Sequence, residues 1–208
     1  LKEQQQKYYG LSPALHFSLF PQKPYIFDAK VFTENALVGQ ADRLFSDQGG
    51  HQISQETHPH GWGTLMVVGT GLGSSSYLVF DITDAEQAPK LMAELKVKNS
   101  GSTISLVSVL THKNQQGQLE WSLVLGSGTD SDPGSITGLS SKKTAGMYIF
   151  NLKDIQSEHK QSPPRFIDLK ESMSYVAGIS GADWDLDGET DALYLNTASV
   201  RKNTGSLS

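Results

Sequence analysis

The chain of 208 residues contains no cysteine, which excludes disulfide bonds and every metal site built on thiolate ligands. It also has no block of basic residues. Its 17 lysines and arginines are outnumbered by 22 acidic residues, which gives a formal net charge of −5. A mildly acidic chain without a basic block is not expected to bind nucleic acid or an anionic membrane as its main partner.

Long apolar runs are absent as well. The longest aliphatic stretches, such as residues 65–68, are only a few residues long, whereas a transmembrane helix needs about 20. We therefore expect no transmembrane segment. The first thirty residues also lack the apolar core of a signal peptide. The chain begins at Leu1 rather than methionine, which we interpret as a fragment whose targeting segment has been removed.

The most informative stretch is the acidic segment 183–191. Carboxylates stand at its positions 1, 3, 5 and 9 and a glycine at position 6, namely Asp183, Asp185, Asp187, Asp191 and Gly188. Ca²⁺ takes about six to eight oxygen ligands in flexible geometry, and a glycine permits the sharp bend that brings them together. An EF-hand would place a glutamate at position 12, where this chain has Tyr194. An apolar run follows the segment, so we predict a calcium loop that leads into a strand.

The charges of this segment favour a bound cation. Two carboxylates about 5 Å apart repel each other by roughly 3 kcal/mol at an effective dielectric constant of about 20. Four converging acids would therefore resist folding without a counter-charge. The alternative is a solvated acidic turn, whose side chains spread apart into water.

Elsewhere, short apolar strands are separated by glycine turns, and this unit recurs. Residues 69–73 and 126–128 are the glycine turns, and residues 80–84 match residues 150–154 position for position. A third copy begins with a strand at 193–197, after which we expect no returning strand. The expected strands are 14–20, 30–32, 36–38, 63–68, 77–82, 90–97, 121–125, 147–152 and 193–197.

Repeats of about 40 to 70 residues with glycine turns are typical of a β-propeller. Blades of roughly 40 to 50 residues would allow about four here, fewer than a closed propeller usually needs. We therefore predict an all-β fold in which residues 1–208 form part of one β-propeller domain, with the neighbours of its edge blades missing. The domain would carry a polar loop insert at about 46–60 and the calcium loop at 183–191. A two-sheet β-sandwich is the alternative.

Three stretches resemble the C-terminal propeller of the PilC/PilY family, the large adhesins at the tips of bacterial type IV pili. They are the hairpin 62–84 with its Phe-Asp-Ile-Thr-Asp corner, the second hairpin 121–152, and the segment 181–194 with the sequence Gly-Ala-Asp-Trp-Asp-Leu-Asp-Gly-Glu-Thr-Asp-Ala-Leu-Tyr. The resemblance covers roughly residues 60–200, and only the acidic loop is individually specific. The long polar insert 46–60 and the polar end 198–208 depart from the family pattern.

The resemblance implies that one Ca²⁺ is bound by the side chains of Asp183, Asp185, Asp187 and Asp191 and by the backbone carbonyl of Glu189. It implies a non-enzymatic protein, exported through the periplasm to the pilus tip or outer surface, that acts in pilus biogenesis, twitching motility and adhesion. The implied partners are pilins or minor pilins and a host or abiotic surface.

Two other functions stay open. The first is an integrin-like calcium-binding adhesion module, although integrin-type propellers tend to repeat the calcium loop and this chain has one good copy. The second is a propeller enzyme, such as a quinone-dependent dehydrogenase or a hydrolase. Such an enzyme needs arginine, lysine and acidic groups at the propeller axis, and we identify no such cluster in the sequence.

The glycine-rich segment 69–73 leads into a β-rich stretch rather than a helix, so it predicts a hairpin turn and not a phosphate-binding loop. His51, His58 and His60 lie in a polar segment. We expect them to be solvated, because no acidic residue or cysteine completes the set of ligands that a metal site needs.

The segment around Asp130 holds two aspartates and a glycine, which predicts a polar turn rather than a second calcium loop. Trp62, Trp121 and Trp184 are expected to pack between blades. For Trp184, exposure for contact with a partner is the alternative.

Overall fold

The computed structural model describes residues 23–32, 58–71, 75–85, 87–96, 101–130, 141–155, 163–199 and 204–207. Within these ranges the regular structure is almost entirely β, with one 3-10 turn, η1 (Pro59–Gly61), and one short helix, α2 (Leu152–Ile155). The strands are β1 (Tyr25–Lys30), β2 (Trp62–Gly69), β3 (Ser76–Asp81), β4 (Lys90–Lys96), β5 (Ser108–Lys113), β6 (Leu119–Gly126), β7 (Thr144–Asn151), β8 (Arg165–Ser172), β9 (Ser174–Ala182), β10 (Ala192–Ser199) and β11 (Thr204–Leu207).

These strands form three antiparallel sheets. Sheet 1 has the order β1-β2-β3-β4, sheet 2 has β5-β6-β7-β8, and sheet 3 has β11-β10-β9. In each sheet, strands that are consecutive in sequence are neighbours in space. The all-β prediction is confirmed, and there are three sheets rather than the two of the sandwich alternative. The described strands do not close into a barrel or a ring.

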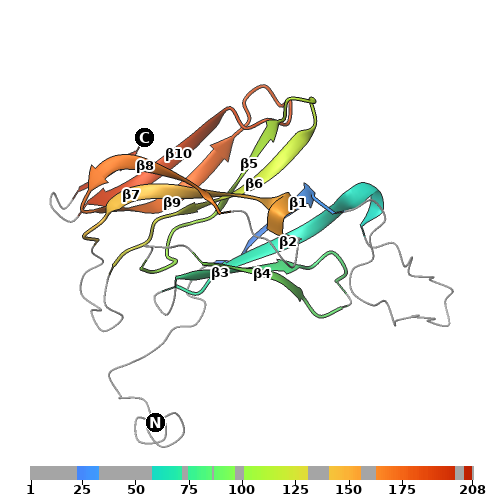
Figure 1. Cartoon of the computed structure of the whole chain (residues 1–208), viewed down its shortest axis with the longest axis horizontal. Helices are drawn as coiled ribbons and strands as arrows, with labels where there is room; N and C mark the ends of the chain where they lie inside the picture. Colours follow the sequence, from blue (N-terminus) through green and yellow to red (C-terminus); the bar gives the residue numbers. More distant parts are fainter. Residues whose placement is uncertain are drawn as a thin grey trace, which may run out of the picture.

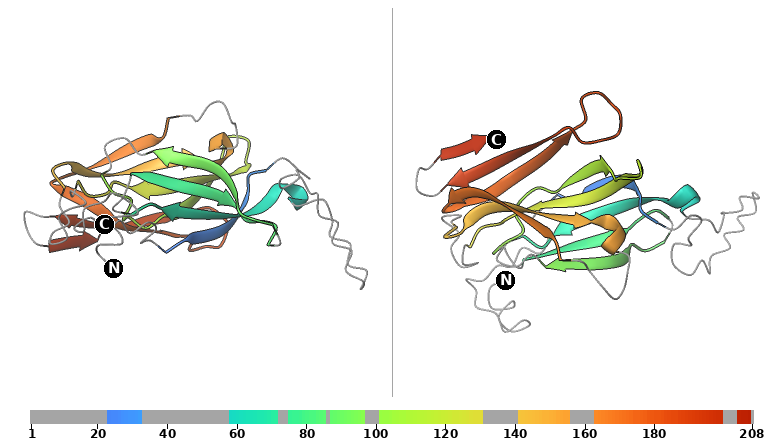
Figure 2. Two further views of the ribbon diagram at one scale, coloured as in Figure 1. Left: turned by 90° about the horizontal axis from the view of Figure 1, so that it is seen from below. Right: turned by 45° about the horizontal axis from the view of Figure 1, so that its top comes forward.

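Sheet 2 lies between the other two sheets (Figures 1 and 2). One apolar core fills the space between sheets 1 and 2, and a second one lies between sheets 2 and 3. Leu123 and Leu125 of β6 belong to the first core, and Val124 between them belongs to the second. Side chains alternate between the two faces of a strand, so β6 is buried on both faces. Each such aliphatic side chain contributes about 1.5–3 kcal/mol through burial.

The expected internal repeat is confirmed. Residues 80–84 and 150–154 both begin at the end of a third strand, β3 in sheet 1 and β7 in sheet 2. The glycine turns expected at 69–73 and 126–128 both follow a second strand, β2 or β6. Residues 69–71, the described part of the first glycine turn, therefore belong to a hairpin and not to the start of a helix.

Sheet 3 differs from the prediction in two ways. The strand expected at 193–197 is the second strand of its unit rather than the first, because β9 precedes it. A returning strand does follow, since β11 pairs with β10 from Asn196↔Leu207 to Ser199↔Thr204. The expectation that no such strand appears was wrong. Backbone pairing does not require apolar side chains, and β11 has the sequence Thr-Gly-Ser-Leu.

Other strand predictions vary in outcome. The strands expected at 63–68, 77–82, 90–97, 121–125 and 147–152 correspond to β2, β3, β4, β6 and β7. The strand expected at 30–32 lies earlier, as β1, and β5, β8 and β9 were not predicted. Residues 14–20 and 36–38 lie outside the described residues.

His58 corrects the interpretation of the polar insert 46–60. Its side chain is 2% exposed, its Nε2 lies 3.0 Å from Asp81 Oδ2, and its ring stacks on Phe32 with centroids 3.6 Å apart. The other carboxylate oxygen of Asp81 accepts hydrogen bonds from the backbone N–H and hydroxyl of Thr83. His58 is therefore a core residue, and His60 beside it is exposed as expected. Residues 46–57, including His51, lie outside the described residues.

Gly126, at the end of β6, offers a test of how closely the sheets approach. A Cβ added there would lie 2.2 Å from Ser105 Oγ and 2.7 Å from Val176 Cβ in sheet 3. Overpacking of this kind costs about 1–3 kcal/mol, so we expect Gly126→Ala to lower the free energy of unfolding by about 2 kcal/mol in urea denaturation. Gly178→Ala is the control, because its nearest atom would be 3.4 Å away. An equal loss in both variants would contradict the close approach as the cause.

Candidate metal centre

The acidic segment 183–191 connects β9 to β10 in sheet 3. Its base is closed by a hydrogen bond from the Asp191 N–H to the Ala182 carbonyl oxygen, 2.9 Å long. Gly188 has φ +88°, a conformation that glycine adopts without steric cost, so the glycine at position 6 makes the bend expected of it. Leu186 also has a positive φ, +61°, and its side chain is 85% exposed. The loop therefore projects from the sheet into solvent.

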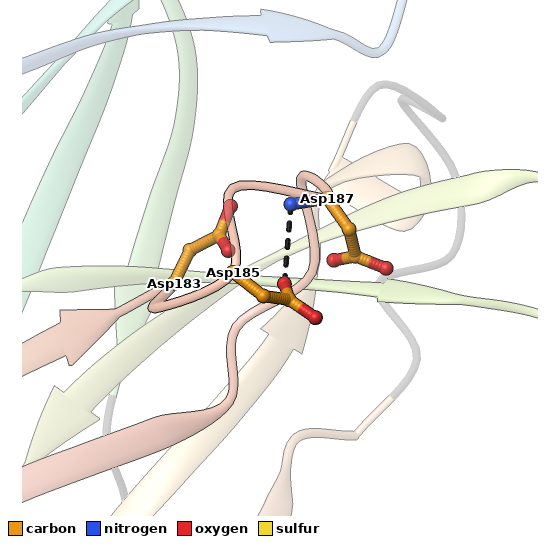
Figure 3. Close-up of side chains that lie close together, drawn as sticks. All are labelled: Asp183, Asp185 and Asp187. Carbon is orange, nitrogen blue, oxygen red and sulfur yellow. Dashed lines mark hydrogen bonds between the residues drawn. The ribbon is translucent and has the colours of Figure 1, made fainter.

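Three of the predicted ligands come together. Carboxylate oxygens of Asp183, Asp185 and Asp187 all lie within 4.8 Å of one another (Figure 3). Backbone N–H groups of the same loop hold them in place: Gly188 donates to Asp183 Oδ2 at 2.9 Å, Asp187 to Asp185 Oδ1 at 3.2 Å and Glu189 to Asp187 Oδ1 at 2.8 Å. The fold of the loop thus concentrates negative charge in one place.

The other oxygen of Asp183, Oδ1, is buried and has no hydrogen-bond partner among the described residues. Leaving a buried acceptor of a charged group unsatisfied is costly. A cation held by the three aspartates would satisfy this oxygen, and hard carboxylate oxygens are the ligands that Ca²⁺ prefers. The residues present therefore fit the metal ion that the sequence predicts.

The carboxylates of Asp191 and Glu189 are not members of this group and have contacts of their own. Asp191 Oδ2 accepts the backbone N–H of Trp184 at 2.7 Å. The Glu189 carboxylate contacts Lys113 with both oxygens, accepting the Lys113 backbone N–H and lying 2.9 Å from its Nζ. The role predicted for Glu189 concerned its backbone carbonyl, so the ion pair does not conflict with it.

Lys113 is the site residue that sequence reasoning missed. Its Nζ also lies 2.8 Å from Asp187 Oδ2, and the two acids are 74 and 76 residues away in the chain. Hydrogen bonds to Asp187 and Glu189 raise the pKa of Lys113, and the hydrogen bond from Lys113 lowers the pKa of each carboxyl group. All three groups therefore stay charged around neutral pH. No local pattern in the sequence could have indicated this contact.

The loop is also attached to sheet 2 along the edge of β5. The Thr190 N–H donates to the Thr111 carbonyl at 2.8 Å, and the Thr111 N–H donates to Thr190 Oγ1 at 2.9 Å. The Gly181 N–H donates to Ser108 Oγ at 3.1 Å. We call these contacts between β5 and residues 181–190, together with those of Lys113, the seam. A cavity of about 230 Å³ lies there, and Asp183 is one of its lining residues. The position of the loop is thereby coupled to the junction of two sheets.

The three tryptophans were all predicted to be packing residues, but their exposure differs. Trp121 is buried in the first core, and Trp62 meets its ring edge-on at 5.5 Å while remaining 43% exposed. Trp184 is 68% exposed, with its ring centroid 6.4 Å from that of Tyr194. Trp121 therefore packs between sheets 1 and 2, whereas the packing role predicted for Trp184 is wrong, because the ring of Trp184 is exposed on the loop.

Asp130 lies beside Lys142 and Lys143. Its carboxylate contacts the Lys143 ammonium at 2.8 Å and accepts the Lys142 backbone N–H at 2.9 Å. The polar turn predicted after Asp130 stays a prediction, because residues 131–140 lie outside the described residues. The second aspartate of that segment, Asp132, lies outside the described residues.

Comparison of the sequence with known protein families gives no match, and comparison with curated proteins gives none either. Among solved structures, the chain is similar to the crystal structure of the Pseudomonas aeruginosa PilY1 C-terminal domain, with 19% sequence identity and a TM-score of 0.47. The match covers 65% of this chain and 25% of that chain, so it spans about a quarter of the similar protein's length. Within the described residues, no helix has both the length and the apolar character needed to cross a membrane.

Proposed function

We propose that this chain is a calcium-binding, non-enzymatic segment of a β-propeller in a type IV pilus-tip protein. The observation that carries the calcium site is Oδ1 of Asp183, which is buried beside the carboxylates of Asp185 and Asp187 and finds no hydrogen-bond partner in the described part of the chain. Support for the pilus assignment comes from the sequence, through the hairpins 62–84 and 121–152 and the acidic loop that follows them.

The propeller arrangement is supported by an equivalence between sheets 1 and 2. Val68↔Leu78 and Met66↔Phe80 are cross-strand pairs of sheet 1. The corresponding pairs of sheet 2, counted from the glycine that ends each second strand, are Leu125↔Tyr148 and Leu123↔Phe150. These four side chains of sheet 2 belong to the core between sheets 1 and 2.

The equivalent side chains of sheet 1 belong to neither core. Register places Ile26, Met66, Phe80 and Leu91 in one row across the four strands, and the outermost two are 56% and 54% exposed. This apolar face of sheet 1 is equivalent to the face of sheet 2 that packs on sheet 1. We therefore infer that it packs against a further sheet, as successive blades do in a propeller. An experimental structure in which the face lies bare to solvent would contradict this inference.

The calcium site would act on the arrangement of the sheets. Asp183, Asp185 and Asp187 would hold Ca²⁺ together with Asp191 and the Glu189 carbonyl oxygen, and the bound ion would supply the charge that neutralises these acids. The backbone N–H donors of Gly188 and Glu189 keep the carboxylates oriented in the loop. Through the seam, a fixed loop keeps sheet 3 aligned with β5 of sheet 2.

An ordered seam suits a protein that transmits or withstands force outside the cell. We propose pilins or minor pilins and a host or abiotic surface as partners, and pilus biogenesis, twitching motility and adhesion as the processes served. The exposed Trp184 and Leu186 at the loop tip lie where a partner could contact the calcium-bound loop.

Calorimetric titration of the chelator-stripped protein tests the calcium site. We expect one Ca²⁺ to bind per chain, and we expect Asp187→Ala and Asp191→Ala each to weaken or abolish binding because each removes a charged ligand. Titration with Mg²⁺ is the control, since Mg²⁺ demands a smaller octahedral set of ligands. Absence of heat with the unaltered protein, or binding indifferent to both substitutions, would reduce the loop to an acidic turn.

A further inference from the structure

We infer that Lys113 is a tethered competitor of the cation: its ammonium group occupies the acidic loop when no metal ion is bound, and it thereby sets the cation affinity of the loop. This inference rests on the proposed calcium site and adds a regulating residue to it. Lys113 comes from β5 in sheet 2, whereas every predicted ligand comes from the connection between two strands of sheet 3.

The competition follows from the contacts of Asp187. Its Oδ1 accepts the Glu189 N–H at 2.8 Å, and its Oδ2 lies 2.8 Å from Lys113 Nζ. Both oxygens are therefore engaged, one of them by a full positive charge. A divalent cation that shares this carboxylate must approach the ammonium group, and like charges at such distances repel.

Lys113 is tethered because its backbone is fixed independently of its side chain. The Lys113 N–H donates to the Glu189 carboxylate, and two residues earlier Thr111 exchanges hydrogen bonds with Thr190. The ammonium group cannot diffuse away as a dissolved ion would, so its effective concentration at the loop stays high.

Glu189 can hold the ammonium group of Lys113 after a cation displaces it from Asp187. Its Oε2 lies 2.9 Å from Lys113 Nζ, and its side chain is not required in the predicted set of calcium ligands. When a cation takes Asp187, Lys113 can keep its contact with Glu189. Exchange between the two states would therefore break the ion pair between Lys113 and Asp187 and leave the other contacts of the seam in place.

Removal of the competing charge tests the inference. Lys113→Met keeps a long unbranched side chain without the charge, and we expect the calcium affinity measured by calorimetry to rise about tenfold at low ionic strength. The gain should shrink at high salt, because exposed charges are screened. Lys113→Arg retains the charge and should bind with nearly the original affinity.

Lys96→Met provides the matched control. It makes the same change in net charge, but Lys96 lies in β4 of sheet 1 and its contact in the described residues is Glu94 at 3.7 Å. We expect less than about a twofold change in affinity there, since the charge lies far from the loop and is screened. A tenfold gain in this control as well would overturn the inference, because net charge alone would then explain the effect.

A second measurement distinguishes competition from a merely structural role. In the calcium-free protein, the amides of Thr111 and Thr190 should exchange with deuterium faster in Lys113→Met than in the original, because the bridge to Asp187 and Glu189 is lost. Calcium should restore their protection. Unchanged or weaker calcium affinity in Lys113→Met would overturn the inference while leaving the calcium site in place. If neither protein binds calcium, the calcium site itself is refuted.

Discussion

Replacing Asp183 with asparagine is expected to lower calcium affinity at least about a hundredfold, since calcium affinity follows the number of charged ligands. The same change should leave the calcium-free protein as stable as before or more stable. Asparagine retains an oxygen that can accept the Gly188 N–H at the position of Oδ2. It also replaces the charged carboxylate, whose buried Oδ1 has no hydrogen-bond partner within the described ranges, by a neutral amide group, which relieves the repulsion from Asp185 and Asp187. The substitution therefore separates the binding role of Asp183 from its structural one.

Thermal unfolding with and without calcium measures both effects. A ligand present at 100 times its dissociation constant stabilises the folded state by about 2.7 kcal/mol, which corresponds to a rise of roughly 5–10 °C for a chain of this size. We expect this rise in the original protein and a rise of no more than about 1–2 °C in Asp183→Asn at the same calcium concentration. Asp168→Asn is the control, because Asp168 lies in β8 and pairs with Lys170. A calcium-dependent rise that persists in Asp183→Asn would place the metal ion elsewhere.

His58→Ala is expected to lower the free energy of unfolding by about 3 kcal/mol, the range found when one partner of a buried pair is removed. Asp81 is 3% exposed, so loss of the imidazole leaves its Oδ2 without this partner in a region that water reaches poorly. The stacking contact with Phe32 is lost as well. Thr83 continues to donate to Oδ1, which limits the loss. The midpoint of thermal unfolding should fall by roughly 6–12 °C.

A double-mutant cycle shows whether the pairing is responsible. Asp81→Asn and the double variant with His58→Ala should give a coupling energy of at least about 1 kcal/mol, as expected for directly contacting groups. His112→Ala is the matched control, because this histidine is 47% exposed and lies 3.7 Å from Glu120. We expect a change within about 0.5 kcal/mol there. Equal losses in His58→Ala and His112→Ala would contradict the buried pair as the cause.

The parts of the fold that sequence reasoning found are those with a local pattern. Short apolar runs before a glycine turn located β2 and β6, and the returning apolar runs located β3 and β7. The strand β8 was missed although its side chains alternate in exposure, because Arg-Phe-Ile-Asp-Leu-Lys-Glu-Ser mixes charge and apolar residues on a partly solvated edge. The strand β9 was missed because its small residues, Ala-Gly-Ile-Ser-Gly-Ala at the end, carry no alternation of hydrophobicity.

The same distinction between local patterns and long-range contacts applies to the candidate site. Spacing alone brought Asp183, Asp185 and Asp187 together, since residues two apart on a turning loop share one side of it. Lys113 and the Thr111–Thr190 bonds join positions 74 to 79 residues apart, and His58 meets Asp81 across 23 residues. Contacts of this kind depend on how sheets pack, and a single sequence contains no local pattern for them.

The seam also bears on solubility. A strand at the edge of a sheet presents unpaired N–H and C=O groups, which invite another chain to add a strand and start aggregation. On β5, the outward backbone groups of Thr111 and the N–H of Lys113 are already bonded to Thr190 and Glu189. The acidic loop therefore caps this edge and surrounds it with charge, so β5 is protected from pairing with a second molecule.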